Sequence, residues 1–265
     1  MITRLAPMHW MTLALLACGL AWARVPVARA AAPSSQGTTA THAQRPASTD
    51  SSLANLAAHL RAHPGDQAAA KAFRQRARRA GQLDSAITIL KGILIGHPEA
   101  QAIRMQLALA HVDRLPAAPA LDLPAQAVMA SQATRLFAEI TAAEPEQWGP
   151  RYAGGMTQLL FPLPSRHYEP AAEDFLKLLE LQRTLPPGPH FVHTYVALGD
   201  AYVMDKQLDM ARTWWQAGKK AFPGDSELAD RLAIDLEALL TTIAARYSFN
   251  QPFDTDREFL DLVPR

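Results

Sequence analysis

A fixed spacing of small, aromatic and proline residues over positions 192–225 constrains the fold of this chain most. The marked positions in these 34 residues are Tyr195, Leu198, Gly199, Tyr202, Ala211, Trp215, Gly218 and Pro223. The small residues Gly199 and Ala211 allow two antiparallel helices to approach closely. Pro223 stops the second helix because proline has no backbone N–H. We therefore expect a helix-turn-helix unit here.

The same spacing recurs earlier in the chain. Residues 82–86 (QLDSA) align with residues 207–211 (QLDMA) at a separation of 125 residues, and Pro98 aligns with Pro223 at the same separation. Pro64 also precedes Pro98 by 34 residues. A unit of this length that recurs indicates stacked helix pairs.

The period lengthens in the middle of the chain. The extra residues fall in two proline-rich segments, 115–124 and 161–170, where a helical pattern breaks. We expect both segments to lengthen the turn inside a repeat. The predicted elements are a lone helix near 52–62, helix pairs over 67–97, 101–145, 148–188 and 192–222, and one closing helix from Glu227 to Tyr247, which Ser226 or Asp225 can cap.

This pattern resembles the tetratricopeptide repeat, and the resemblance covers about residues 52–247. It implies an all-α fold, a right-handed α-solenoid of antiparallel helix pairs with a capping C-terminal helix. Arg74 departs from the family pattern, which usually has Gly at that position, and Ile93 stands where a small residue is usual. The resemblance also implies a non-catalytic scaffold, in which the first helix of each repeat lines a concave groove that holds a peptide or helix of a partner protein.

The groove positions of the family, carried over residue by residue, give two sets of partner-binding candidates. The cationic set is Lys71, Arg78 and Arg79, within a run of five cations over residues 71–79. Such a patch would hold an acidic peptide, a carboxyl terminus or an anionic wall polymer. The second set, which suits an apolar or amphipathic helix, is Met105, Leu109, Tyr152, Met156, Val196, Asp200 and Met204. The alternatives are a solvated helical face for the first set and core residues for the second.

Three further regions flank the repeat domain, which we assign to residues 51–247. Residues 31–50 are rich in Ala, Ser, Thr and Pro, and we expect a flexible linker there. The tail, residues 248–265, contains a capping-box pattern that begins at Thr255 and predicts a short helix. It would fold back onto the solenoid as a clasp or as an occupant of the groove; the alternative is a frayed terminus.

Residues 1–30 have the features of a bacterial export signal. Arg4 precedes an apolar run over residues 11–23, and a small-residue cleavage pattern ends at Ala30. We therefore expect cleavage after Ala30 and a periplasmic protein. Two alternatives keep the protein at a membrane: an uncleaved signal that serves as an anchor, and a lipoprotein processed at Cys18.

Charge and motifs exclude several function classes. The chain has 26 basic and 25 acidic residues, so nucleic acid is not indicated as a partner. The sequence has no phosphate-binding glycine loop, no nucleophile elbow and no zinc-protease motif, so we expect neither catalysis nor a cofactor. The histidine pairs His59/His63 and His190/His193 lack the acids or thiolates that would complete a metal site, so we expect no metal.

The sequence thus favours a non-catalytic periplasmic scaffold that binds another protein or peptide. One alternative is an accessory factor in cell-envelope or cytochrome maturation that presents an apoprotein segment. Another is a carrier of a small ligand or metal. Peripheral association with the envelope is compatible with each of them.

Overall fold

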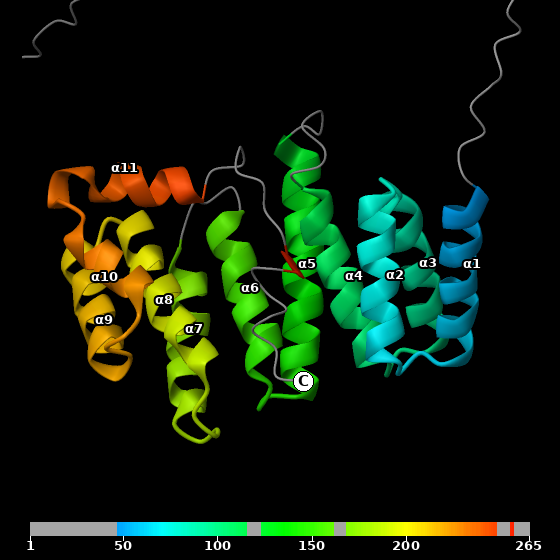
Figure 1. Cartoon of the computed structure of the whole chain (residues 1–265), viewed down its shortest axis with the longest axis horizontal. Coiled ribbons are helices and arrows are strands. Elements are labelled where there is room, and N and C mark those ends of the chain that lie inside the picture. The colour runs from blue at the N-terminus through cyan, green and yellow to red at the C-terminus, as the bar shows by residue number, and fades with distance from the viewer. Residues whose placement is uncertain (1–46, 116–122, 162–167, 248–254, 257–265) are drawn as a thin grey trace, which may run out of the picture. The chain divides into compact units, whose positions relative to one another are not determined.

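The computed structural model describes residues 47–115, 123–161, 168–247 and 255–256. These residues form helices and no strand (Figure 1). The helices are α1 (Ala47–Ala62), α2 (Gln67–Arg79), α3 (Leu83–Gly96), α4 (Gln101–Arg114), α5 (Leu123–Ala143), α6 (Trp148–Leu160), α7 (Glu169–Gln182), the 3-10 helix η1 (Pro189–Phe191), α8 (Val192–Met204), α9 (Leu208–Ala221), α10 (Ser226–Ala233) and α11 (Leu236–Arg246). None of the described helices is long and apolar enough to cross a membrane.

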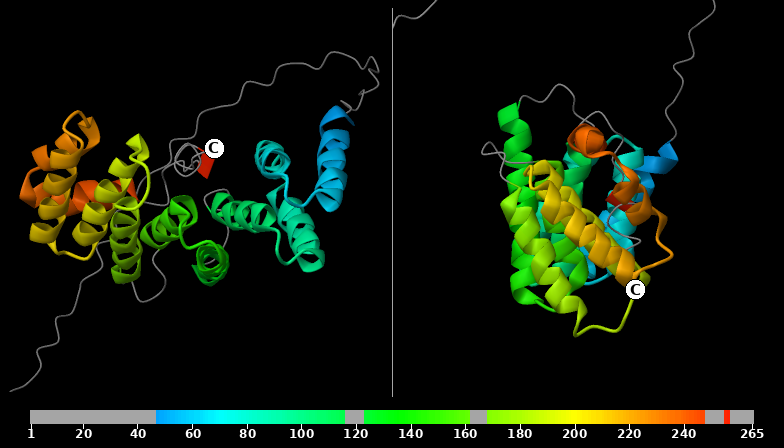
Figure 2. Two further views of the ribbon diagram at one scale, coloured as in Figure 1. Left: turned by 90° about the horizontal axis from the view of Figure 1, so that it is seen from below. Right: turned by 90° about the vertical axis from the view of Figure 1, so that its left-hand side faces the viewer.

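The helices stack as pairs along the chain (Figures 1 and 2). The second helix of each pair packs against its partner and against the first helix of the next pair, as α3 does against α2 and α4. First helices also contact each other, α2 with α4 and α6 with α8. We call α2, α4, α6 and α8 the first-helix row. The predicted all-α solenoid of helix pairs is confirmed.

Close packing explains the residue spacing in the last pair, α8 and α9. A Cβ atom added to Gly199 would lie 2.1 Å from Nε1 of Trp215, so only glycine leaves room for the indole ring. Trp215 is fully buried, and its Nε1 donates a hydrogen bond to the Val196 carbonyl at 3.2 Å. Ala211 is also fully buried. The spacing therefore records helix contact, as expected.

Replacement of Gly199 by alanine is expected to lower the free energy of unfolding by about 1–3 kcal/mol, because the added methyl group displaces the Trp215 indole from its site. Urea denaturation followed by circular dichroism would measure the change. Gly92 in α3 supplies the matched control, since a Cβ atom there meets nothing within 4 Å. Gly92→Ala should leave stability unchanged or raise it by up to about 1 kcal/mol; an equal loss in both variants would contradict the packing argument.

Both proline-rich segments follow the first helix of a pair, as expected, and their last two residues begin the second helix. α4 ends at Arg114 and α5 begins at Leu123; α6 ends at Leu160 and α7 begins at Glu169.

The N-terminal boundary of the helical domain differs from the expected one. α1 begins at Ala47, within the segment expected to be flexible.

The prediction of one closing helix over residues 227–247 is wrong, because the segment forms two helices. α10 and α11 are separated at Ile234 and Asp235, which both have extended backbone angles. The break leaves the Ile234 carbonyl outside a helix, and Arg212 Nη2 donates a hydrogen bond to it at 3.1 Å. The bend lets α10 pack on α9 and α11 pack on α8, so both helices of the last pair are covered.

The last two helices close the core with a capped start and apolar side chains. The carboxylate of Asp225 accepts a hydrogen bond from the backbone N–H of Leu228 at 2.8 Å, which confirms Asp225 as the cap. Leu228 in α10 and Leu239 and Ile243 in α11 are buried in the hydrophobic core. This end of the repeat stack is therefore shielded from water.

Candidate functional site

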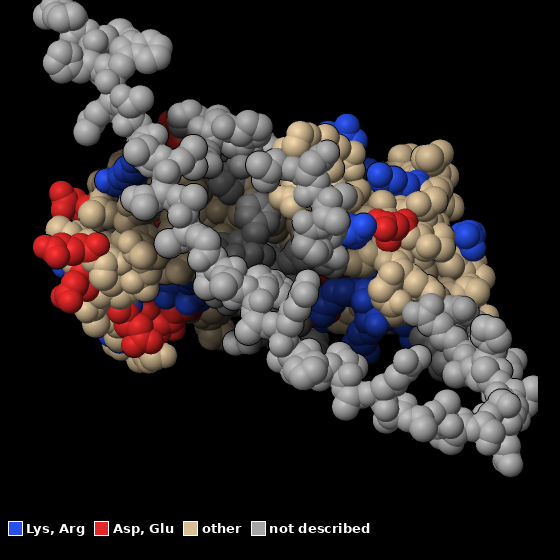
Figure 3. Space-filling view, turned by 90° about the horizontal axis from the view of Figure 1, so that it is seen from above, with Lys and Arg blue, Asp and Glu red and all other residues tan. Residues whose placement is uncertain are grey.

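The first candidate region is the cationic helix α2, which carries five basic residues and no acidic one. On the face drawn in Figure 3, Lys and Arg side chains gather toward the end that holds the N-terminal helices, and most acidic side chains lie toward the opposite end. The five cations do not share one environment. Arg79 is exposed, Lys71 and Arg78 are half-buried, and Arg74 is completely buried.

Arg74 reaches from α2 to the neighbouring first helix α4. Its Nε donates a hydrogen bond to Gln106 Oε1 at 2.8 Å, and its Nη1 pairs with the carboxylate of Asp113, whose side chain is also completely buried. Arg78, one turn further along α2, places its Nη1 3.4 Å from the other Asp113 oxygen. We call Arg74, Arg78, Gln106 and Asp113 the arginine site.

Two residues of the C-terminal tail lie in the arginine site. Thr255 is completely buried, and its Oγ1 accepts a hydrogen bond from Arg74 Nη1 at 2.8 Å and donates one to Asp113 Oδ1. The carboxylate of Asp256 pairs with Arg74 Nη2 through Oδ1, and its Oδ2 lies 3.2 Å from Arg78 Nη2. At these two residues, the tail folds back onto the first-helix row. The rest of the tail, 248–254 and 257–265, lies outside the described residues.

Sequence reasoning named Arg78 as a partner-binding residue but missed Arg74, Gln106 and Asp113. Arg74 stands 125 residues before Gly199, so it occupies the position of the glycine that makes room for a tryptophan in the last pair. Arg74 at a packing position was the signal that could have revealed the site, because a buried charge requires charged or hydrogen-bonded partners. The departure from the repeat pattern is the centre of the site.

The second set of predicted contacts lies mostly in the hydrophobic core. The buried members are Leu109, Tyr152, Met156 and Val196, and the half-buried ones are Met105 and Met204. The four buried side chains do not form an open apolar surface in this structure. Their role in partner binding stays a prediction that requires a rearrangement to expose them.

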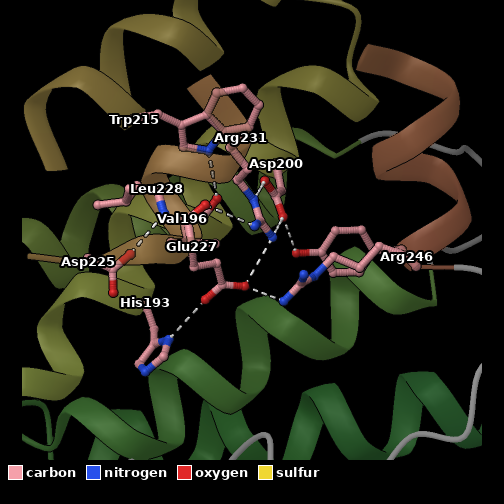
Figure 4. Close-up of polar contacts among 10 residues, drawn as sticks. His193, Val196, Asp200, Trp215, Asp225, Glu227, Leu228, Arg231 and Arg246 are labelled. Carbon is pink, nitrogen blue, oxygen red and sulfur yellow. Dashed lines mark hydrogen bonds and ion pairs between the residues drawn. The ribbon is translucent and has the colours of Figure 1, made fainter. Parts of the chain in front are cut away.

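Asp200, the charged member of that set, belongs to a buried polar network at the other end of the first-helix row (Figure 4). Its Oδ1 accepts a hydrogen bond from Arg231 Nε at 2.6 Å, and its Oδ2 accepts bonds from Arg231 Nη2 and the Tyr247 hydroxyl, both at 2.7 Å. Burial and the neighbouring carboxylate raise the pKa of Tyr247 well above its ordinary value. Asp200 therefore ties α8 to α10 and to the end of α11, which is a structural role.

The histidine pairs have structural contacts of their own. His193 Nδ1 lies 3.8 Å from the Glu227 carboxylate, and the ring of His190 packs edge-on against Trp148 with the centroids 5.0 Å apart. His59 Nε2 hydrogen-bonds at 2.8 Å to the carboxylate that caps α2. Within the described residues, no group of three or more His, Cys, Asp or Glu side chains is arranged to hold a metal ion.

A cavity of about 360 Å³ lies between α3, α4 and α5. Its lining is Lys91, Leu94, Ile95, Leu107, His111, Gln132, Arg135, Leu136 and Glu139. His111 is only 2% exposed, and neither of its ring nitrogens has a hydrogen-bond partner among the described residues. Burial, together with the charge of Lys91, lowers the pKa of His111 to about 4, so the ring is neutral at pH 7.

Comparison with known proteins identifies the fold. No protein-family model and no curated protein matches the chain. Among solved structures, a tetratricopeptide repeat protein from Parabacteroides merdae is similar at 18% identity and a TM-score of 0.51, over 75% of this chain and 69% of that one. TTC0263, a repeat protein of the same kind from Thermus thermophilus, is 20% identical with a TM-score of 0.49, over 70% of this chain and 89% of that one. MamA is 15% identical with a TM-score of 0.47, over 66% and 89%.

Proposed function

Because the chain has the tetratricopeptide repeat fold and its arginine site already holds a peptide segment, we propose that it is a non-catalytic scaffold that binds a segment of another protein on the first-helix row. The observation that carries this proposal is the contact of Thr255 and Asp256 with Arg74. A site that holds two residues of one peptide chain has the chemistry to hold the same groups from another.

The composition of the site suits a segment that offers hydrogen-bonding and acidic groups. Arg74 and Gln106 are held in place by packing between α2 and α4, so their donors and acceptors point in fixed directions. Arg78 is half-buried at the entrance to the buried centre, and Lys71 and Arg79 lie on the same helix, so α2 adds positive charge near that entrance. Charged groups at the entrance accelerate association with an acidic partner and favour it over a basic one.

The proposed location is the periplasm. It is supported by the charged start, the apolar run and the small-residue pattern of residues 1–30 in the sequence. Cell fractionation of the tagged protein tests this location, and recovery from the cytoplasm alone would contradict it.

Charge reversal at the entrance should weaken partner binding without loss of the fold. In the variant with Lys71 and Arg79 replaced by glutamate and Arg78 by glutamine, which adds no second carboxylate beside Asp113, we expect recovery of a crosslinked acidic partner to fall at least about tenfold, because attraction is lost and partly becomes repulsion. In-cell crosslinking of the tagged protein followed by mass spectrometry measures the recovery. The effect should be smaller at high salt, which screens exposed charges.

The matched control has the same change in net charge elsewhere on the surface. Arg61, Arg135 and Lys220 are exposed and lie on α1, α5 and α9. Replacement of Arg61 and Arg135 by glutamate and of Lys220 by glutamine should leave partner recovery within about twofold of the native protein, since the three residues lie outside the proposed site. Equal losses in the two triple variants would show that net charge, not the α2 surface, controls binding.

A further inference from the structure

The contacts in the arginine site specify its ligand in more detail than the general description of an acidic peptide. Resting on the proposed function, we propose that the site recognises a hydroxyl residue, Ser or Thr, directly followed by an acidic residue in the partner protein. Thr255 and Asp256 are the chain's own copy of that pair, and the partner's pair must displace them.

The requirement for a hydroxyl group follows from the two opposite charges around Thr255. Its Oγ1 accepts a hydrogen bond from Arg74 and donates one to Asp113, so the site needs a small group that does both. An apolar side chain would make neither bond in a fully buried position. A phosphorylated hydroxyl would place its negative charge against the Asp113 carboxylate and would be repelled. The site therefore suits an unmodified Ser or Thr.

The requirement for an acid follows from the two arginines. The helix pairs contribute two guanidinium groups, Arg74 and Arg78, and one carboxylate, Asp113, to this cluster. The carboxylate of Asp256 bridges the two guanidinium groups, one oxygen to each. Charge-assisted bonds of this kind are stronger and more directional than neutral ones. A neutral amide at this position would lose the charge attraction to both arginines.

Competition follows from the tether between the occupant and the repeat domain. α11 ends at Arg246, so only a short segment separates it from Thr255. A ligand on a short tether has an effective concentration on the order of millimolar. The apparent affinity of a partner segment with the same chemistry is therefore its intrinsic affinity multiplied by the fraction of molecules whose site is empty.

The test uses the full-length exported protein and a fluorescent peptide with the sequence of residues 249–263. Fluorescence anisotropy would compare the native protein with a full-length variant that carries Thr255→Val and Asp256→Asn, whose own tail cannot fill the site. We expect the peptide to bind this variant at least tenfold more tightly than it binds the native protein. Equal affinities would overturn the proposal, because the tail would then not occupy the site.

Three altered peptides test the chemistry without any change in the protein fold. Peptides with the Thr255→Val change, with the Asp256→Asn change or with a phosphate on Thr255 should each bind the tail variant at least tenfold more weakly than the unaltered peptide. Equal binding of any of the three would overturn the corresponding requirement. Adding Arg78→Gln to the tail variant should also lower the affinity for the unaltered peptide. Unchanged affinity would mean that the peptide binds outside the arginine site.

The outcomes separate this inference from the proposed function. If no peptide binds but partner recovery depends on the α2 cations, the scaffold remains and the hydroxyl-acid rule is overturned. If the peptide binds as expected but no partner is recovered from cells, the recognition chemistry remains and the scaffold function is overturned.

Discussion

Replacement of Arg231 by methionine is expected to lower the free energy of unfolding by about 3–5 kcal/mol. Asp200 is completely buried and receives two of its three hydrogen bonds from this guanidinium group. Without it, the Asp200 carboxylate stays buried with the Tyr247 hydroxyl as its remaining donor in this network. Urea denaturation at pH 7, followed by far-ultraviolet circular dichroism, would measure the loss.

A neighbouring arginine provides the control for this prediction. Arg246 pairs with Glu227 near the same network, but its side chain is 49% exposed. Arg246→Met should therefore cost less than about 1 kcal/mol, as is usual for surface ion pairs. A second variant, Asp200→Leu combined with Arg231→Met, removes both buried charges and should recover much of the lost stability. Similar losses at Arg231 and Arg246 would contradict a special role for burial.

The protein is expected to lose about 3 kcal/mol of stability through His111 as the pH falls from 6.5 to 4. The pKa of His111 is lowered to about 4 in the folded protein, whereas an unfolded histidine titrates near 6.5. Between these values the unfolded chain binds a proton that the folded chain excludes, so acid favours unfolding. The contribution is fully present above pH 6.5 and is lost progressively down to pH 4.

Denaturation midpoints at a series of pH values would measure this dependence. His111→Met keeps an apolar side chain of similar size in the cavity and should remove most of the His111 contribution between pH 6.5 and 4. Leu136→Met is the control, because Leu136 lines the same cavity and does not titrate. The Leu136 variant should keep the native pH dependence of the free energy of unfolding. If both variants lost that dependence equally, His111 would be ruled out as its source.

Most of the fold could be predicted from the sequence because the packing of a helix pair depends on a few nearby residues. Gly199 and Trp215 lie in one unit and contact each other directly, so their spacing reports the contact. The break at Ile234 was not predictable in this way. No Pro or Gly marks it, and the side chain that satisfies its carbonyl, Arg212, comes from a different helix.

The candidate site was only partly predictable, since its contacts join distant segments. The cations of α2 are visible in the sequence, but Thr255 lies 181 residues after Arg74, and no local pattern connects the two. Repeat positions likewise indicate which face of a helix a residue occupies without indicating what covers that face. Leu109 and Tyr152 were placed on the expected helices, yet the structure buries both.

The contact between Arg74 and Thr255 also determines which part of the fold forms last. Helix pairs join residues close in sequence, so they can form as each segment of the chain becomes available. Thr255 follows every helix pair in the sequence, so it is synthesised after all of them. The newly emerged N-terminal repeat therefore exists for a time with its arginine pair unmatched by the tail. During that interval the proposed partner segment would meet no internal competitor, so binding during synthesis and binding to the finished chain are different reactions.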